Sequence, residues 1–94
     1  MTTNQLPEKM QGLRKQIDTC DDFLVKILAY RFRLVNDVRS VKKIEKLPAV
    51  DPVRFQEIID KSRNLALAEK LDPDLVEEIF QVIHKYSVKA IEEV

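Results

Sequence analysis

The stretch AYRFRLVNDVRSVKK, residues 29–43, decides the fold that we expect for this chain. Its apolar side chains recur at helical spacing, which predicts an amphipathic helix. Arg31 and Lys42 nevertheless occupy positions within the apolar stripe. Because successive residues of an α-helix are rotated by about 100°, these two side chains point in directions that differ by only about 20°. The stretch therefore predicts a helix with two cations on the face that it would bury.

Proline positions set the limits of this helix and of two others. Pro7 suits a first helical turn, and no proline follows until Pro48. Two Asp-Pro pairs, beginning at Asp51 and Asp72, each place an N-cap carboxylate before a proline at the first helical position. The helices are expected at about 6–45, 52–69 and 73–93.

Length and composition indicate one all-α domain. A chain of 94 residues is too short for two separate cores, so residues 1–94 are expected to form a single domain. The chain is 45% hydrophobic and 34% charged with one glycine, a balance typical of helical proteins. We therefore expect one long and two shorter helices.

The first helix is too long for a monomer. At about 1.5 Å per residue it would extend about 60 Å, whereas a compact domain of this size has a radius of gyration of about 13 Å. Two-fold dimers are the commonest oligomers, so an intertwined helical homodimer is expected. Apolar positions follow almost the whole helix: Leu13, Ile17, Leu24, Ile27, Leu28, Leu34, Val35, Val38 and Val41.

Charge and cysteine content argue against several classes of protein. Basic and acidic residues number 16 each, so no net field attracts nucleic acid or anionic lipid. Neither a long apolar run nor a signal-peptide pattern occurs. Cys20 has no cysteine partner and is expected to be a small core residue. We expect a soluble cytoplasmic protein that binds neither nucleic acid nor membrane.

The cations of the long helix have two interpretations. Arg14 lies in the same stripe as Arg31 and Lys42. Their stems could cover apolar surface while their charges reach water. A buried charge without a partner costs several kcal/mol, so an anionic partner is the alternative: Asp21 of the same stripe, or an anionic ligand.

The shorter helices add weaker signals. Arg54 lies in a first turn, where the helix dipole disfavours a cation, although ordinary surface placement explains it equally well. Ser87 interrupts an apolar stripe, where serine often bonds back to a carbonyl one turn earlier. His84 beside it is more often structural than a ligand. With no histidine or cysteine cluster, the pattern indicates an anion-binding site without metal or nucleophile.

In order and spacing, these pieces resemble the all-helical, AroQ-type chorismate mutase family. The resemblance covers essentially the whole chain and implies an isomerase of aromatic amino acid biosynthesis in the shikimate pathway. It also implies a homodimer with two active sites, each completed by an arginine of the other protomer. The matching pieces are LRKQID (residues 13–18), Arg31, Lys42, DPVR (residues 51–54) and YSV (residues 86–88).

Carried onto matching positions, the resemblance implies a role for each site residue. The crossing arginine would be Arg14, which with Arg31 would clamp the two carboxylates of the substrate. Lys42 would donate to the ether oxygen and a carboxylate, and Ser87 would contact a carboxylate. The remaining positions would be Asp51 at the ring hydroxyl, Arg54 in the polar wall and Val38 in the apolar wall.

The implied reaction explains the lack of acid–base machinery. Chorismate becomes prephenate by an intramolecular [3,3] rearrangement, which needs no proton transfer, covalent intermediate or cofactor. A site that holds the folded conformer lowers the entropic barrier. A fixed cation facing the ether oxygen stabilises the charge that develops there in the transition state. Lys42, supported by Arg31, is the candidate for this role.

Two positions depart from the family pattern. Ile91 stands where a glutamine or glutamate usually donates to the ether oxygen, a loss that commonly costs about 10²–10³ in rate. Phe55 stands where many members have a glutamate near the ring hydroxyl. The contributions of Phe55, His84 and Ile91 to the pocket therefore stay open. So do the alternatives: isochorismate-pyruvate lyase, 4-amino-4-deoxychorismate mutase, or a non-catalytic helical interaction module.

Overall fold

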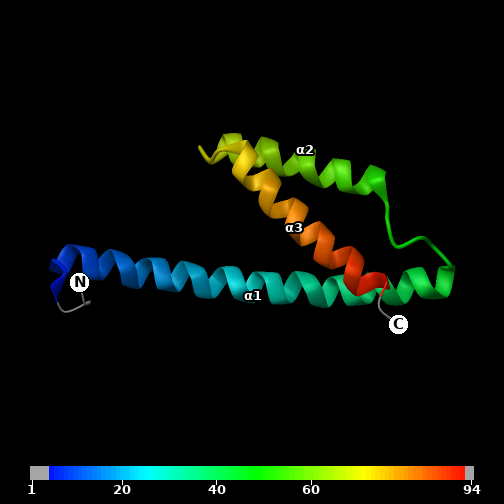
Figure 1. Cartoon of the computed structure of the whole chain (residues 1–94), viewed down its shortest axis with the longest axis horizontal. Helices are drawn as coiled ribbons and strands as arrows, with labels where there is room; N and C mark the ends of the chain where they lie inside the picture. Colours follow the sequence, from blue (N-terminus) through cyan, green and yellow to red (C-terminus); the bar gives the residue numbers. More distant parts are fainter. Residues whose placement is uncertain (1–4, 93–94) are drawn as a thin grey trace. The chain divides into compact units, whose positions relative to one another are not determined.

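Three α-helices make up the described part of the chain, residues 5–92 of a computed structural model (Figure 1). No strand occurs within that range. The expected all-α class, with one long and two shorter helices, is confirmed. The helices are α1 (Glu8–Glu45), α2 (Pro52–Ala68) and α3 (Pro73–Glu92). The expected end of the third helix at residue 93 lies outside the described residues.

The long helix α1 begins two residues later than expected. Its start follows Pro7, whose carbonyl oxygen accepts from the Gln11 backbone N–H at 3.0 Å. The Gln11 side chain donates to the carbonyl oxygen of Leu6 at 2.7 Å. Glu8 in the first turn and two lysines in the last turn complement the helix dipole. Residues 6 and 7 therefore precede the helix and supply acceptors to its first turn.

Both shorter helices begin at the Asp-Pro pairs, as predicted. Asp51 has an extended backbone, and its carboxylate accepts from the Arg54 N–H at 3.0 Å. The carboxylate of Asp72 accepts from the Asp74 N–H at 2.9 Å. Each carboxylate satisfies an N–H that has no partner inside the helix. The sequence signals for these two starts are confirmed.

Lysines in left-handed conformation follow α1 and α2. Lys46 has φ 56° and Lys70 has φ 60°. After α1, the Leu47 N–H donates to the Lys42 carbonyl oxygen at 2.8 Å, and after α2 the Leu71 N–H donates to that of Ala66 at 2.8 Å. This six-to-one hydrogen bond is typical of a Schellman helix end, where glycine is usually found.

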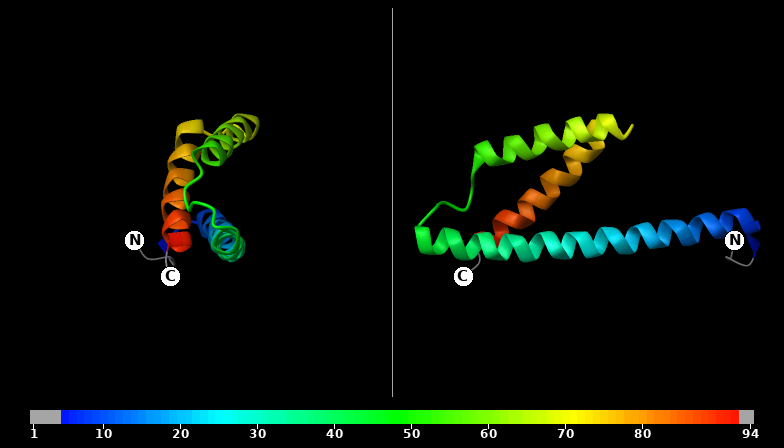
Figure 2. Two further views of the ribbon diagram at one scale, coloured as in Figure 1. Left: turned by 90° about the vertical axis from the view of Figure 1, so that its right-hand side faces the viewer. Right: turned by 180° about the vertical axis from the view of Figure 1, so that it is seen from behind.

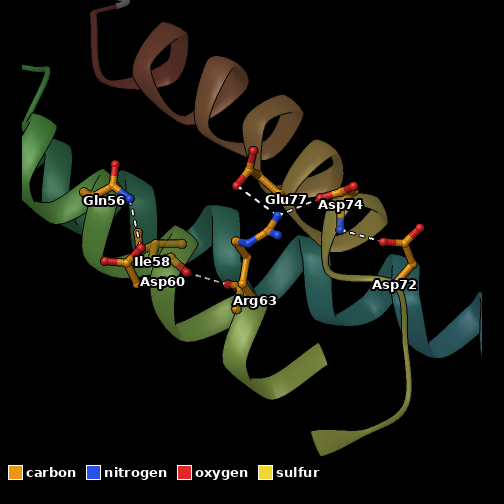
Figure 3. A network of polar contacts seen from close by, with 8 residues as sticks. Gln56, Ile58, Asp60, Arg63, Asp72, Asp74 and Glu77 are labelled. Carbon is orange, nitrogen blue, oxygen red and sulfur yellow. Dashed lines mark hydrogen bonds and ion pairs between the residues drawn. The ribbon is translucent and has the colours of Figure 1, made fainter. Parts of the chain in front are cut away.

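Helices α2 and α3 pack on each other and lie side by side near their connecting turn (Figure 2). Arg63 of α2 reaches toward α3, where its Nη1 lies 3.0 Å from Asp74 Oδ1 and 3.3 Å from Glu77 Oε1 (Figure 3). The hydrogen bond to Asp74 is the main cause that raises the pKa of Arg63 above its ordinary value. The charged guanidinium joins the two helices next to the turn.

Little of the chain is buried. The chain divides into two compact units, residues 1–33 and 34–94, and α1 contributes to both. Among residues 5–92, the buried ones are Ile59, Ser62, Ala66 and Ser87, all from α2 and α3. No residue of α1 is buried. The expectation of a core position for Cys20 is therefore wrong for the single chain, in which this thiol is exposed.

The exposed surface of α1 carries many large apolar side chains. Phe23, for example, is 65% exposed. Large contiguous apolar patches on a protein surface commonly mark a site that other protein covers. Among the described helices, none combines the length and apolarity that a membrane span requires. The exposed large apolar residues of α1 are Met10, Leu13, Ile17, Phe23, Leu24, Val25, Ile27, Leu28, Tyr30, Leu34, Val38, Val41 and Ile44.

Candidate functional site

Arg14 lies on a shallow hollow of the unit formed by residues 1–33. The hollow is lined by Gln11, Arg14, Lys15, Ile17 and Asp18, which the helical repeat brings to one side of α1. Arg14 is exposed, and no ion pair engages it within residues 5–92. Its guanidinium, with five N–H donors in a planar fork, can hold a carboxylate from outside this unit.

Arg31, in the same unit, is half-buried on α1. Most neighbouring residues of the helix are exposed, so Arg31 is more covered than most of α1. A partly covered guanidinium binds a carboxylate more strongly than a fully solvated one, because the local dielectric is lower. Arg31 thus combines charge and partial burial, as an anion-binding residue requires.

Lys42 belongs to the last turn of α1, within the unit formed by residues 34–94. The side chain is half-buried, and its Nζ donates to the carbonyl oxygen of Ala49 at 2.9 Å. Its position is therefore defined by the loop after α1. An ammonium group has three N–H donors, so two remain for a ligand. Val38, one turn earlier on α1, is exposed and supplies apolar surface.

Asp51 and Arg54 stand at the start of α2. The carboxylate of Asp51 caps the helix through the Arg54 N–H. The Arg54 guanidinium lies 3.6 Å from Glu57, and both side chains are well exposed. The carboxylate of Glu57 thus offsets the unfavourable interaction of the Arg54 cation with the positive end of the helix dipole. Ordinary surface placement, the alternative considered from the sequence, describes Arg54 in the single chain.

Ser87 is buried, and its hydroxyl donates to the Ile83 carbonyl oxygen at 2.8 Å. This confirms the interpretation of a serine bonded one turn back. Ser62 of α2 does the same with Ile58 at 2.6 Å. The backward bond alone therefore does not distinguish a site residue from a structural one.

The structure brings Phe55 and His84 together. Their ring centroids are 4.0 Å apart and the planes meet at 24°, so the rings are stacked. Both residues are half-buried, as is Ile91 two turns further along α3. Of the three positions whose contributions the sequence left open, Phe55 and His84 thus form a direct contact between α2 and α3.

Within the unit formed by residues 34–94, direct contacts join two pairs of the predicted residues. Asp51 is linked to Arg54 by its cap, and Phe55 to His84 by stacking. Sequence reasoning missed Ala49, because this residue acts through a backbone carbonyl that no side-chain pattern reveals. Within residues 5–92, no group of three histidine, cysteine, aspartate or glutamate residues could hold a metal ion. The functional roles of the site residues stay predictions.

Comparison with known proteins identifies the family. The family model described as chorismate mutase type II matches residues 13–92, a range that contains every candidate site residue. A chorismate mutase of Methanocaldococcus jannaschii is 33% identical over 80 residues, which cover 85% of this chain and 81% of that protein. T-protein of Enterobacter agglomerans is 34% identical over 79 residues, which cover 84% of this chain but 21% of that protein. This chain therefore belongs to the chorismate mutase type II family.

Proposed function

We propose that this chain is an isomerase that converts chorismate to prephenate. The observation that carries the proposal is the family match over residues 13–92, which includes the three cations singled out on α1. The reaction needs a dicarboxylate clamp and a fixed positive charge, and it needs no proton-transfer group. Arg14, Arg31 and Lys42 supply these requirements.

Arg14 and Arg31 bind the two carboxylates of the substrate in this proposal. A guanidinium matches a carboxylate with two parallel N–H bonds, which fixes orientation as well as charge. Two such contacts at the ends of a flexible substrate hold its folded conformer and lower the entropic part of the barrier. The unpaired, exposed guanidinium of Arg14 supports this role.

Lys42 stabilises the ether oxygen as the carbon–oxygen bond breaks. Negative charge develops on that oxygen in the transition state, so a cation placed there favours the transition state over the substrate. The hydrogen bond to Ala49 supports the assignment, because it orients the ammonium before the substrate arrives. Such a group requires little reorganisation during the reaction.

The remaining residues form the ring end of the proposed site. Asp51 accepts from the ring hydroxyl, Arg54 supports the polar wall, and Val38 covers the ring. Ser87 contacts a carboxylate; its single hydroxyl proton, now donated to Ile83, must turn toward the substrate for this contact. This assignment requires the hydroxyl of Ser87 to rotate on binding.

The active form in this proposal is a homodimer with shared active sites, in which Arg14 reaches into the site of the partner. The absence of any buried residue on α1 supports this arrangement, since a second copy would cover its large exposed apolar side chains. A cytoplasmic location suits a biosynthetic enzyme and the exposed thiol of Cys20, because reducing compartments keep thiols free.

A substrate panel tests the function. Purified protein is incubated with millimolar chorismate, and prephenate formation above the uncatalysed rate is expected. If prephenate forms no faster than in the uncatalysed reaction, the proposal is excluded. Isochorismate, assayed for salicylate and pyruvate, and 4-amino-4-deoxychorismate test the related enzymes, which stay second candidates because Ile91 cannot donate to the ether oxygen. A non-catalytic module would turn over none of them, and no dicarboxylate would raise its melting temperature.

A further inference from the structure

The stacked rings of Phe55 and His84 connect the capped start of α2 to the middle of α3. The Phe55 N–H donates to the Asp51 carbonyl oxygen at 3.0 Å, so the two residues share the first turn of α2. The Phe55 ring in turn stacks on His84 at 4.0 Å between centroids. A continuous series of contacts therefore links Asp51 to an imidazole on the neighbouring helix.

The imidazole of His84 is held in place with its hydrogen-bonding capacity unused. Phe55 covers one face of the ring, and the nitrogens lie in the ring plane at its edge. Within residues 5–92, no hydrogen bond engages either nitrogen. A neutral imidazole has one N–H donor and one acceptor, and a half-buried polar group gains stability by finding a partner. A ligand could supply that partner.

His84 also shares a helix face with a proposed substrate contact. Ser87 follows it by three positions and Ile91 by seven, a spacing that places all three on one side of α3. Ser87 is assigned above to a carboxylate of the substrate, and Ile91 stands where the family usually has a donor to the ether oxygen. Among the side chains at these three positions, His84 therefore supplies an N–H donor, Ser87 an O–H donor and Ile91 none.

We propose that His84 recognises the ring substituent of the substrate by donating an N–H hydrogen bond to its hydroxyl oxygen. The proposal rests on the proposed function, in which Asp51 accepts from the same hydroxyl. A hydroxyl has one proton to donate and two lone pairs to accept with, so it can satisfy Asp51 and His84 together. Phe55 is the positioning residue, because stacking fixes the plane of the imidazole.

This arrangement selects a hydroxyl over an amine at the same ring position. A protonated amine has three donors and no lone pair, so it can bind Asp51 but gives His84 nothing to donate to. Phe55 supplies no carboxylate that would compensate the added positive charge. The pair of rings therefore favours chorismate over 4-amino-4-deoxychorismate.

The ratio of kcat/KM for chorismate to kcat/KM for 4-amino-4-deoxychorismate tests this proposal on the full chain. His84→Phe keeps an aromatic partner for Phe55 and removes both nitrogens. We expect kcat/KM for chorismate to fall by roughly 3- to 10-fold, the range of one neutral hydrogen bond, and that for the amine to stay unchanged. If the amine is not turned over, its inhibition constant against chorismate replaces its kcat/KM.

Phe55→Leu tests the positioning role. It leaves the imidazole but removes the stacked ring, and we expect the substrate ratio to fall in the same direction. Tyr86→Phe is the matched control, since it removes one donor from an aromatic residue of α3 that is 51% exposed and has no assigned role. Circular dichroism and melting temperature check folding, and His84→Leu replaces His84→Phe if that variant does not fold.

The outcomes separate this proposal from the proposed function. Wild-type protein that turns over neither substrate overturns both. Wild-type turnover with an unchanged ratio in His84→Phe overturns the His84 assignment alone, whether both rates stay the same or fall together. A fall in the ratio for His84→Phe but not for Phe55→Leu removes the positioning role of Phe55 and retains the donor role of His84.

Discussion

Lys42 donates from Nζ to the carbonyl oxygen of Ala49 at 2.9 Å, while its own carbonyl oxygen accepts from the Leu47 N–H at 2.8 Å. The last turn of α1 and the following loop therefore hold this lysine through both its side chain and its backbone. A cation whose position is fixed before the substrate binds stabilises developing charge more effectively than a mobile one. The loop thus contributes to catalysis without providing a side chain.

Replacing Lys42 with glutamine should remove catalysis and leave the fold. The amide can still donate toward Ala49 but has no charge to offer the ether oxygen. We expect kcat to fall by about two orders of magnitude or more, measured as prephenate formation under saturating chorismate. Lys43→Gln, at an exposed position in the same turn, is the control and should retain activity. Equal kcat in wild type and Lys42→Gln would contradict the assignment.

Ser87→Ala should raise KM, whereas Ser62→Ala should not. The two serines are closely matched: each is 8% exposed, and each donates to the carbonyl four residues earlier. Each substitution should change the free energy of unfolding by only about 1 kcal/mol, because each removes a neutral hydrogen bond to a helical carbonyl that keeps its backbone partner. Steady-state kinetics and urea unfolding separate the two effects. Identical KM values in both variants would make Ser87 a purely structural residue.

Ile91→Gln should increase chorismate mutase activity. The amide would restore a donor at a half-buried position from which isoleucine can donate nothing. An increase in kcat of tenfold or more is expected, below the roughly 10²–10³ range of an optimally placed donor. Ile91→Ala, which changes volume without adding a donor, controls for repacking. A decrease in kcat with glutamine would indicate a pocket arranged for a different reaction, and the isochorismate assay would then be decisive.

Helix content and the starts of α2 and α3 could be predicted from the sequence, because their causes are local. The Asp51 and Asp72 caps each involve residues within three positions of one another, so composition and spacing suffice. The backward bond of Ser87 is local for the same reason. The end of α2 is less apparent, since lysine at residue 70 adopts a conformation in which glycine is expected.

Contacts that depend on tertiary packing could not be predicted. The stack of Phe55 on His84 requires the packing of α2 against α3, and helical periodicity does not specify which two residues meet. The Lys42–Ala49 bond depends on the path of a loop, and its acceptor is a backbone atom present in every residue. Burial of Cys20 was expected from residue type alone, but no residue of α1 is buried within the single chain.

Lys70→Gly should stabilise the protein. Lys70 has φ 60°, a conformation that costs an L-residue with a β-carbon about 1 kcal/mol relative to glycine. Urea unfolding should therefore show a gain of up to about 1 kcal/mol, with unchanged activity. Lys61→Gly, within α2 and exposed, is the control and should lose a similar amount, because glycine is unfavourable inside a helix. A loss of stability in Lys70→Gly would indicate that its side chain makes a compensating contact.

Mixed dimers of Arg14→Ala and Arg31→Ala chains should recover activity that neither variant has alone. If Arg14 enters the site of its partner, the mixed dimer has one site with both arginines and one with neither. Random pairing after joint unfolding and refolding should then give about a quarter of wild-type activity. Each variant alone should be a folded dimer by size-exclusion chromatography and should form no prephenate.

The control mixture contains Arg14→Ala chains and chains with both substitutions, so that every site lacks Arg14 whatever the pairing. It should stay inactive. If the first mixture also stays inactive although mixed dimers are detected by mass spectrometry, Arg14 and Arg31 serve the same protomer. The site would then be complete within one chain, and a dimer with shared active sites would no longer explain the apolar side chains exposed on α1.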